Sequence, residues 1–501
     1  MILRKLLNLV LVSALIAGAV VGQQYLPSIG LRAGERPKLQ AISVKAKDLQ
    51  LVCPGAAFRS GGATGTKVGL FDRVGSTQTV YASSLPNGVT LKSYTLMGSQ
   101  SNATALMNTA DTPGRVAISS GADAFALTVL DPAGIASQGS SLVTAQSFQI
   151  VRSSAMNGAL AANCQRPGSE QWLLGSNTSI GREALLILAN PAATDATVDL
   201  QIFGQNGPID GAGLTGISVS ANRFTVLPLS SFASDQELLA VRVSSKGAAI
   251  AAWAQQRTVR GTLAAGADLI SPSIPAGSNL VIPGLFKRGS KDASTLISGN
   301  PNYNDLSPSL AVFVPGGATA TITAQVIGTD TKTFGTVVQQ QISGGSAGSI
   351  PLNGLKDGNY AVFVNSDQPV LASVRLSRTN LTKTPNTDFA WLPAVSTASG
   401  IRMVTTPSSA TTTVISKLSV ANPNPRSARV TVSNLSAGTK SVFAIPRLSS
   451  SVVSVSPGSL ISIESDYPVA TTMISDFDWL LAVIGLVDYK NVGGSLSVLV
   501  R

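Results

Sequence analysis

The sequence predicts an all-β fold built from tandem β-sandwich modules, and three observations carry this prediction. After the N-terminus, long stretches with helical apolar spacing are absent, and short runs of alternating apolar and polar residues are separated by Gly, Pro, Asn and Ser. The composition agrees, with 47 Gly, 12% charged residues and 5% aromatic residues among many Val, Thr and Ser. One stretch of the chain is also echoed further along, which indicates a repeated module.

The echoed stretch lies at 360–392 and returns at 461–481. Both copies contain Ser-Asp-x-Pro-Val and then Asp-Phe-x-Trp-Leu. Because proline suits the entry of a strand and Ser-Asp side chains can bond a turn backbone, we expect two strands joined by a tight turn in each copy. The residues predicted to specify the fold here are Asp367, Pro369, Trp391, Asp466, Pro468 and Trp479.

Asn-Pro is a second recurring signal, and each copy precedes an alternating run, at 196–202, 321–326 and 428–432. The residue before proline is extended and proline cannot donate to a β ladder, so Asn-Pro is predicted to end one strand of a hairpin. The fold-specifying residues in these copies are Asn190, Pro191, Asn300, Pro301, Asn422 and Pro423.

These signals divide the chain into six parts. They are 1–22 (signal peptide or membrane anchor), 23–48 (basic tether), 49–165 (divergent N-terminal β module), 166–275 (β-sandwich repeat 1), 276–395 (repeat 2) and 396–501 (repeat 3). Repeats of roughly 100–120 residues suit an immunoglobulin-like sandwich better than a propeller blade of about 40–50 residues. A β-propeller or another ring closure of β modules is the alternative.

The N-terminus predicts export. Arg4 and Lys5 precede an apolar run that continues to Val21, which is typical of a signal peptide and nearly long enough for a retained anchor, so both alternatives stay open. The net charge is +11, and a basic tract follows the apolar run. We therefore expect an extracytoplasmic protein, secreted or membrane-anchored, whose membrane contact is this N-terminal segment.

Cys53 and Cys164 are the two cysteines, too few for a cysteine-ligated zinc or iron–sulfur centre. In an oxidising location they are predicted to form a disulfide; the alternative is two buried free thiols. Histidine is absent, which excludes His general bases, His-containing nucleophilic triads and His metal ligands. We expect no cofactor, and no nucleic-acid partner, since aromatic residues do not interleave with Lys and Arg.

Three sets of residues could carry chemistry, and each also has a structural interpretation that we favour. Asp476 and Asp478 could act as a carboxylate pair in glycoside hydrolysis or serve the fold. The extra loop of repeat 2 could offer oxygens to calcium or be a solvated turn. Its oxygen-bearing residues are Asn302, Asn304 and Asp305. The two repeat tryptophans, Trp391 and Trp479, could stack on sugars or fill sandwich cores.

The block Leu51-Val-Cys-Pro-Gly55, together with Cys164, Trp172-Leu-Leu-Gly175, Asn190-Pro191 and Ala196-Thr-Val198, resembles an uncharacterised family of secreted or membrane-anchored actinobacterial proteins. That family is known only as a domain of unknown function. The resemblance implies a cell-envelope location and supplies no catalytic residues.

These observations favour a non-enzymatic cell-envelope protein, either a structural spacer or a binding module for wall glycan or an envelope protein. The alternatives are a carboxylate-dependent glycan hydrolase and an accessory subunit of an envelope glycosyltransferase or export system. Function is expected where the repeats differ, because the shared residues specify the fold.

Overall fold

The computed structural model describes residues 38–44, 49–61, 71–74, 78–85, 90–96, 104–108, 114–120, 124–130, 142–329, 335–381, 385–487 and 494–500. The predicted signal or anchor lies outside these residues. The chain forms two units, 1–45 with 493–501, and 46–492. In the first unit, β1 (Lys38–Val44) pairs antiparallel with β36 (Gly494–Val500). Part of the predicted tether is therefore a strand, and its partner comes from the end of predicted repeat 3.

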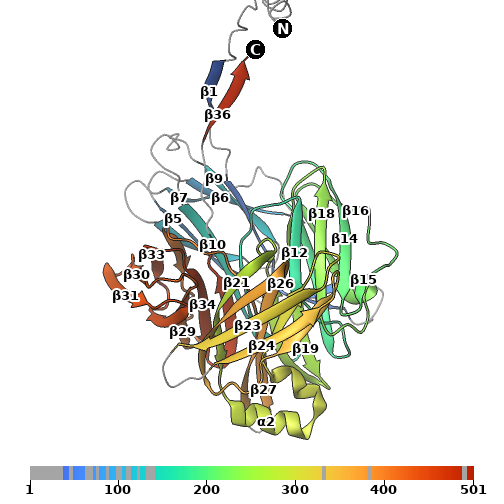
Figure 1. Ribbon diagram of the computed structural model, residues 1–501. Coiled ribbons are helices and arrows are strands. Elements are labelled where there is room, and N and C mark those ends of the chain that lie inside the picture. Colours follow the sequence, from blue (N-terminus) through green and yellow to red (C-terminus); the bar gives the residue numbers. More distant parts are fainter. Residues whose placement is uncertain are drawn as a thin grey trace, which may run out of the picture. The chain divides into compact units, whose positions relative to one another are not determined.

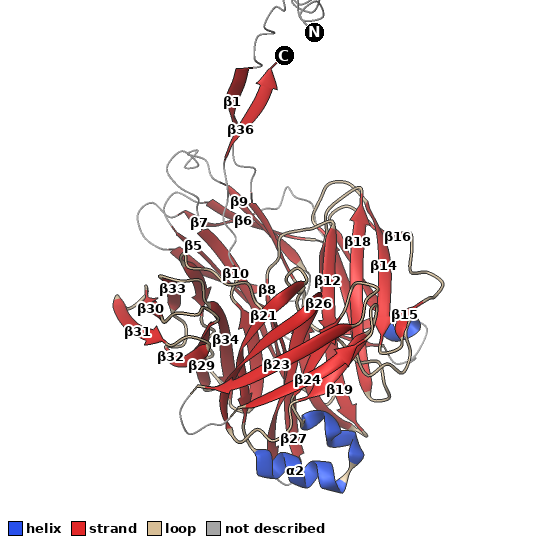
Figure 2. Cartoon of the chain, in the orientation of Figure 1, coloured by secondary structure: helices blue, strands red, loops and turns tan. Residues whose placement is uncertain are grey.

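The second unit is all-β, and the strand pairs of its sheets are antiparallel (Figure 1, Figure 2). Four modules follow one another, each made of two sheets with the same strand order. In one sheet the strand order is first, sixth, third, fourth. In the other sheet the order is fifth, second, seventh, eighth.

The first and second modules follow this order and add short extra strands. In module 1 the eight strands are β2 (Leu49–Cys53), β5 (Gln78–Leu85), β6 (Thr90–Thr95), β7 (Thr104–Asn108), β8 (Gly114–Ser120), β9 (Phe125–Leu130), β10 (Leu142–Arg152) and β11 (Asn157–Asn163), with the extra pair β3 (Phe58–Ser60) and β4 (Phe71–Arg73). In module 2 they are β12 (Glu170–Gly175), β13 (Arg182–Asn190), β14 (Ala196–Gly204), β15 (Gly207–Ile209), β17 (Arg223–Pro228), β18 (Leu239–Lys246), β19 (Ala251–Arg260) and β20 (Leu263–Ile270), with β16 (Ile217–Val219) beside β14 and the 3-10 turn η3 (Leu229–Ser231).

Modules 3 and 4 repeat the order again. In module 3 the strands are β21 (Gly277–Lys287), β22 (Ser309–Phe313), β23 (Ala320–Gly328), β24 (Thr336–Ile342), β25 (Ala347–Pro351), β26 (Gly358–Leu381) and β27 (Pro385–Pro393), with β26 serving as both the sixth and the seventh strand. In module 4 they are β28 (Arg402–Thr405), β29 (Val414–Asn422), β30 (Ala428–Asn434), β31 (Thr439–Ile445), β32 (Ser449–Val455), β33 (Leu460–Ser465), β34 (Ala470–Phe477) and β35 (Leu480–Gly485).

Each module buries apolar side chains between its two sheets, because alternate residues of a strand point to one face. In module 2, for example, Val198, Leu200 and Ile202 of β14 pack in one cluster with Leu186 and Leu188 of β13 in the facing sheet. Modules 3 and 4 have corresponding clusters, and a smaller one fills module 1. The modules are therefore two-layer sandwiches.

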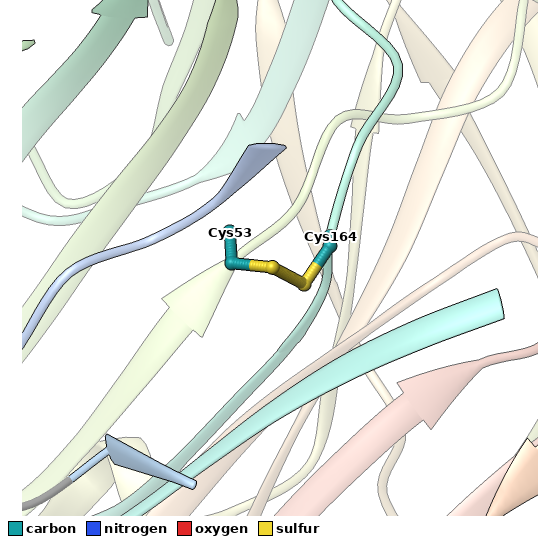
Figure 3. The surroundings of a disulfide bond; sticks show 2 residues. All are labelled: Cys53 and Cys164. Atoms are coloured by element: carbon teal, nitrogen blue, oxygen red, sulfur yellow. A yellow bond between two sulfur atoms is a disulfide. The ribbon is translucent and has the colours of Figure 1, made fainter. Parts of the chain in front are cut away.

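The Cys53–Cys164 disulfide lies in the module 1 cluster and is confirmed, with an S–S distance of 2.06 Å (Figure 3). It joins the last residue of β2 to the residue that follows β11, and so ties the first strand of the module to its last. Closing a loop of 111 residues in this way stabilises the fold by about 4–5 kcal/mol in the chain-entropy model.

The predicted hairpin around Ser-Asp-x-Pro-Val is wrong in its pairing. β26 runs unbroken through Asp367 and Pro369; its first part pairs with β21 and β23, and its second part pairs with β22 and β27. In module 4 the chain bends at Asp466, and β33 and β34 likewise join different sheets. The motif marks a strand that crosses from one sheet to the other, which is a known way to turn a sandwich corner.

The hairpin predicted after Asn-Pro is wrong for the same reason, since β13 and β14 belong to different sheets, as do β29 and β30. Asn190 and Asn422 do end strands, but the sequence does not distinguish a hairpin within one sheet from a connection between the two sheets.

The strand order also differs from that of an immunoglobulin domain. The second strand lies beside the fifth and the third beside the sixth, as in that fold, but here the seventh strand pairs with the second and the first strand pairs with the sixth. The immunoglobulin-like assignment is therefore not confirmed, whereas the all-β prediction is.

The eighth strands of the four modules meet at one place. β11 contacts β20, β20 contacts β27, β27 contacts β35, and β35 contacts β11, so the contacts close a ring in module order. Small residues permit this approach: a Cβ on Gly158 of β11 would lie 2.4 Å from the backbone nitrogen of Ala267 in β20. A propeller blade is a single sheet, so two-sheet modules in ring contact match the ring-closure alternative rather than a propeller.

Asp388 of β27 links all four eighth strands. Its carboxylate accepts backbone N–H bonds from Ala159 of β11 at 3.2 Å, Ala267 of β20 at 3.2 Å and Leu481 of β35 at 2.8 Å. The side chain is buried, and burial raises the pKa of Asp388 above its ordinary value although the four backbone N–H groups around it act in the opposite direction. We call this arrangement the ring centre.

Candidate functional site

Module 3 carries a segment between its first and second strands that modules 2 and 4 lack. It consists of α2 (Ser290–Gly299) and the 3-10 helix η4 (Pro301–Leu306). Asn300 ends α2 and its side chain accepts the N–H of Asn302, while Pro301 opens η4 with its φ already restricted. The segment therefore folds as two short helices, and η4 presents Asp305.

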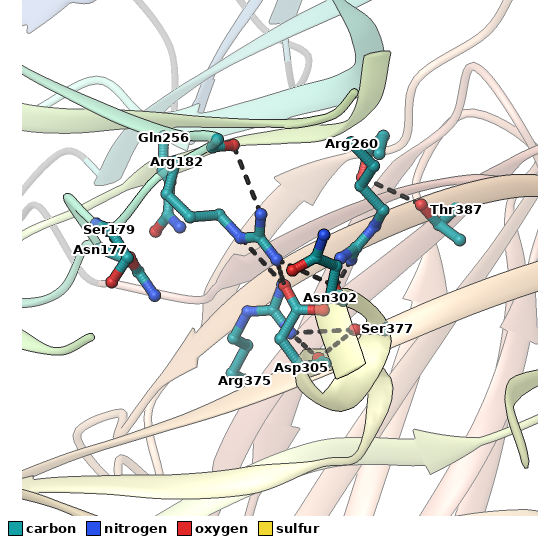
Figure 4. Close-up of polar contacts among 12 residues, drawn as sticks. Asn177, Ser179, Arg182, Gln256, Arg260, Asn302, Asp305, Arg375, Ser377 and Thr387 are labelled. Atoms are coloured by element: carbon teal, nitrogen blue, oxygen red, sulfur yellow. Dashed lines mark hydrogen bonds and ion pairs between the residues drawn. The ribbon is translucent and has the colours of Figure 1, made fainter. Parts of the chain in front are cut away.

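Asp305 meets three arginines from strands of modules 2 and 3 (Figure 4). Arg182 of β13 donates from Nη2 at 2.8 Å and Nε at 3.2 Å to Oδ2, and Arg375 of β26 donates from Nη2 at 3.1 Å to the same oxygen. Arg260 of β19 donates from Nη2 at 2.6 Å to Oδ1. We call these four residues the arginine cluster.

Backbone carbonyls of η4 accept further hydrogen bonds from the arginines of the cluster. The carbonyl of Asn302 accepts from Arg182 Nη2 at 3.2 Å and also from Arg260 Nη1. The carbonyl of Asp305 accepts from Arg375 Nη1, and Ser377 adds a hydroxyl bond to it at 3.2 Å. The segment is thus bound to the cluster by main chain as well as side chain.

Aromatic rings support two of the arginines. The guanidinium of Arg260 lies 4.5 Å from the ring centroid of Tyr303, and that of Arg375 lies 4.7 Å from the centroid of Phe389. Cations are attracted to the faces of such rings, and the planar contact fixes the orientation of the guanidinium. The arginines are therefore held in place before any ligand arrives.

The charges of the cluster are largely withdrawn from water. The side chains of Arg182, Arg260 and Arg375 are 11%, 4% and 8% exposed, and that of Asp305 is 21% exposed. Burial lowers the pKa of Arg375 to about 10, against the opposing effect of Asp305. Burial alone would raise the pKa of Asp305, but the three arginine charges outweigh it and lower that pKa. One carboxylate therefore faces three cations.

A cleft of about 410 Å³ opens over this cluster. Arg182, Arg375 and Asp305 contribute to its wall, and Asn and Ser side chains supply most of the other polar groups. Trp391 also lines it, although this residue is only 6% exposed. Glu237 lies at the wall as a second carboxylate.

The two repeat tryptophans occupy different environments. Trp391 lies on β27, is part of the core cluster of module 2, and donates from Nε1 to Gln256 at 3.2 Å. Trp479 lies in the turn between β34 and β35, half-buried beneath the guanidinium of Arg152 at 5.9 Å. The two Asp-Phe-x-Trp-Leu sequences therefore place their tryptophans in different structural environments.

Two pairs of the predicted turn residues occupy equivalent positions in different modules. Asp367 and Asp466 occupy equivalent places, because each accepts the N–H of the second residue of the third strand of its module, Thr321 at 2.8 Å and Arg429 at 2.7 Å. Asn190 and Asn422 are likewise equivalent, each fully buried at the end of the second strand and bonded to nearby carbonyls.

Asn300-Pro301 is not a third copy of that motif. It ends α2 and begins η4 rather than ending a strand. The prediction that Asn300 and Pro301 specify the module fold is therefore wrong, because the same dipeptide that stops a strand also suits the start of a 3-10 helix.

The other chemical candidates are placed as follows. Asp476 pairs with Arg378 and Arg288, and Asp478 pairs with Arg152 at 3.0 Å, so each carboxylate already faces a cation. Of the calcium candidates, Asp305 is held by arginines, which would repel a metal cation. Among the described residues, no three His, Cys, Asp or Glu side chains gather as a metal site, and no helix is long and apolar enough to cross a membrane.

Fold and cleft together define an all-β protein of two-layer modules in ring contact, with a cleft between the second and third modules that is lined by two arginines and two carboxylates. The chain belongs to a family of unknown function, DUF5719, whose model matches residues 116–445. This match begins in β8 of module 1 and ends with β31 of module 4. The family unit thus takes in parts of all four modules. A search of curated proteins finds no match to the chain.

Proposed function

We propose that this protein is a non-enzymatic, extracytoplasmic component of the actinobacterial cell envelope that binds wall glycan through the cleft beside the arginine cluster. The observation that carries the proposal is the cleft wall itself, which combines fixed arginines with Asn and Ser residues and with Trp391. Such a combination offers charged and neutral hydrogen bonds to a polyhydroxylated ligand with acidic groups.

The location has separate support. A disulfide such as Cys53–Cys164 forms and persists in an oxidising compartment, and the N-terminal sequence is typical of an exported chain. Retention by the N-terminal segment would place the modules on the outer side of the membrane, close to the wall.

The rival glycan hydrolase needs one carboxylic acid with a free proton and one free carboxylate. Asp476 and Asp478 are each paired with arginine, so neither is a free carboxylic acid or a free carboxylate. In the arginine cluster a single carboxylate is surrounded by cations. These arrangements support binding without hydrolysis.

The test is co-sedimentation of the purified protein with insoluble wall glycan, together with an assay for released reducing ends. We expect binding that weakens in Arg182→Gln and no release of sugar by the wild type. Arg429→Gln, on an exposed arginine of module 4, is the matched control and should bind as the wild type does. Release of reducing ends that is lost in Asp476→Asn or Asp478→Asn would establish the hydrolase instead.

A further inference from the structure

The hydrogen-bonding capacity of Asp305 is filled by the arginine cluster. A carboxylate has about four acceptor sites on its two oxygens, and here Oδ2 accepts three N–H bonds and Oδ1 accepts a fourth. No further guanidinium donor can be satisfied by this side chain. The remaining positive charge of the cluster is met by carbonyl dipoles of η4 and, at Arg375, by the nearby Asp268.

One donor is left over on the cleft side, because Nη1 of Arg182 has only a long 3.4 Å contact with the carbonyl of Gly181. Behind the cleft wall, within the described residues, Nε of Arg260 is buried with no hydrogen-bond partner. Arg182 and Arg375 line the cleft, so their groups can be reached from solvent. Positive charges with low exposure and incomplete compensation are costly unless an anion joins them.

We infer that the cleft binds a second oxyanion, a carboxylate or a phosphate, beside Asp305 and between Arg182 and Arg375. This inference rests on the proposed function and names the part of the glycan that the cleft recognises: an acidic substituent rather than a neutral sugar face. Asn177, Ser179 and Asn304 line the same cleft and can bond hydroxyl groups next to the acidic one.

Asp305 has a defined role in this site. It holds the three guanidinium groups in one place through charge-assisted bonds, so the incoming oxyanion meets donors that are already oriented. Glu237 at the cleft wall acts in the opposite direction, because a carboxylate near the site opposes an anionic ligand. The two acidic residues therefore predict mutational effects on anion affinity that a purely structural cluster would not show.

The experiment measures binding of three probes to the full chain by isothermal titration calorimetry at constant ionic strength. The probes are inorganic phosphate, glucuronate and neutral glucose. We expect phosphate or glucuronate to bind and glucose not to bind; the stronger of the two identifies the acidic group. Arg182→Gln should weaken that binding at least tenfold, since a charge-assisted bond is lost.

Glu237→Gln is the second variant and covers the case in which Arg182→Gln fails to fold, because Glu237 is exposed. Its removal should strengthen anion binding about twofold through the screened Coulomb interaction. The matched control is Glu464→Gln, an exposed glutamate of module 4, which should leave the affinity unchanged.

The inference is overturned if the wild type binds neither phosphate nor glucuronate, or if Glu237→Gln and Glu464→Gln give the same affinity. Wall glycan that binds while both probes fail would leave the proposed function standing without this site. Probes that bind in the predicted order while wall glycan does not would leave the oxyanion site standing and remove the glycan as its ligand.

Discussion

The buried Asp388 and the half-buried Asp305 of this protein are held by opposite means. At the ring centre, Asp388 is surrounded by backbone N–H groups from the eighth strands of all four modules. In the arginine cluster, Asp305 is surrounded by side-chain cations from two modules. Both carboxylates are fully bonded, yet only one of these regions carries an excess of charge.

This difference separates a group whose partners are complete from a group that we propose takes part in binding. Backbone N–H groups are neutral and fixed by the strands, so Asp388 completes a closed set of partners with nothing left to bind. Guanidinium groups bring a charge each, and one carboxylate cannot neutralise three of them. A surplus of fixed charge beside an open cleft is what a ligand can use.

The largest effect is expected for Asp388→Ala. The variant leaves backbone N–H groups of β11, β20 and β35 buried without an acceptor, and each such group costs about 1–3 kcal/mol. We expect a loss of about 3–5 kcal/mol in the free energy of unfolding, measured by urea denaturation. Asp210→Ala, on an exposed aspartate, should change it by less than about 0.5 kcal/mol. A loss below about 1 kcal/mol for Asp388→Ala would show that the ring closes without this group.

Asp268 of β20 predicts how the stability of the protein depends on pH. It accepts the N–H of Trp391 at 2.7 Å, and burial raises its pKa to about 7. The folded state therefore binds a proton more tightly than the unfolded state, whose aspartate titrates near 4. Stability should be highest at about pH 4 and fall as the pH rises to about 7, by about 2–4 kcal/mol from this residue.

Urea denaturation at several pH values between about 4.5 and 7.5 measures this slope. Asp268→Asn, which cannot ionise, should have a smaller slope than the wild type. An unchanged slope in the variant would assign the effect to other groups, and stability that rises over this range would contradict the prediction.

Asp305→Ala tests the arginine cluster. The three arginines lose their shared carboxylate, and since Arg182 and Arg375 line the cleft, we expect a loss of about 2–3 kcal/mol in unfolding free energy. Added phosphate should restore part of that stability by occupying the vacated site, whereas the Asp388→Ala variant should gain nothing specific from it. Equal responses of the two variants to phosphate would remove the distinction between the two regions.

The sequence predicted the strands well, because alternation and turn residues are local signals. The expected runs at 196–202, 321–326 and 428–432 lie within β14, β23 and β30. It did not predict which strands pair, since an arch between sheets and a hairpin within one sheet use the same turn residues. β26 shows this most clearly, because Asp367 and Pro369 lie inside one unbroken strand.

The sites were harder to predict than the strands. The expectation that function lies where the repeats differ stays a prediction, and no spacing in the sequence connects Asp305 with Arg182, Arg260 and Arg375, which are 45–123 positions away. The role of Asp388 was equally hidden. The short sequence that contains it recurs at Asp476, where the same letters occupy the end of a different strand.

The smallest expected effects concern the aspartates at the exposed corners of the sandwiches. Asp367 and Asp466 each accept one backbone N–H, and each can be replaced without leaving a buried charge. Asp367→Ala and Asp466→Ala should therefore each lower the unfolding free energy by about 1 kcal/mol. Urea denaturation of both variants measures whether the two corners are equivalent. A difference of more than about 1 kcal/mol between them would show that the unbroken β26 and the bent β33–β34 corner depend on the carboxylate to different extents, despite the shared hydrogen bond.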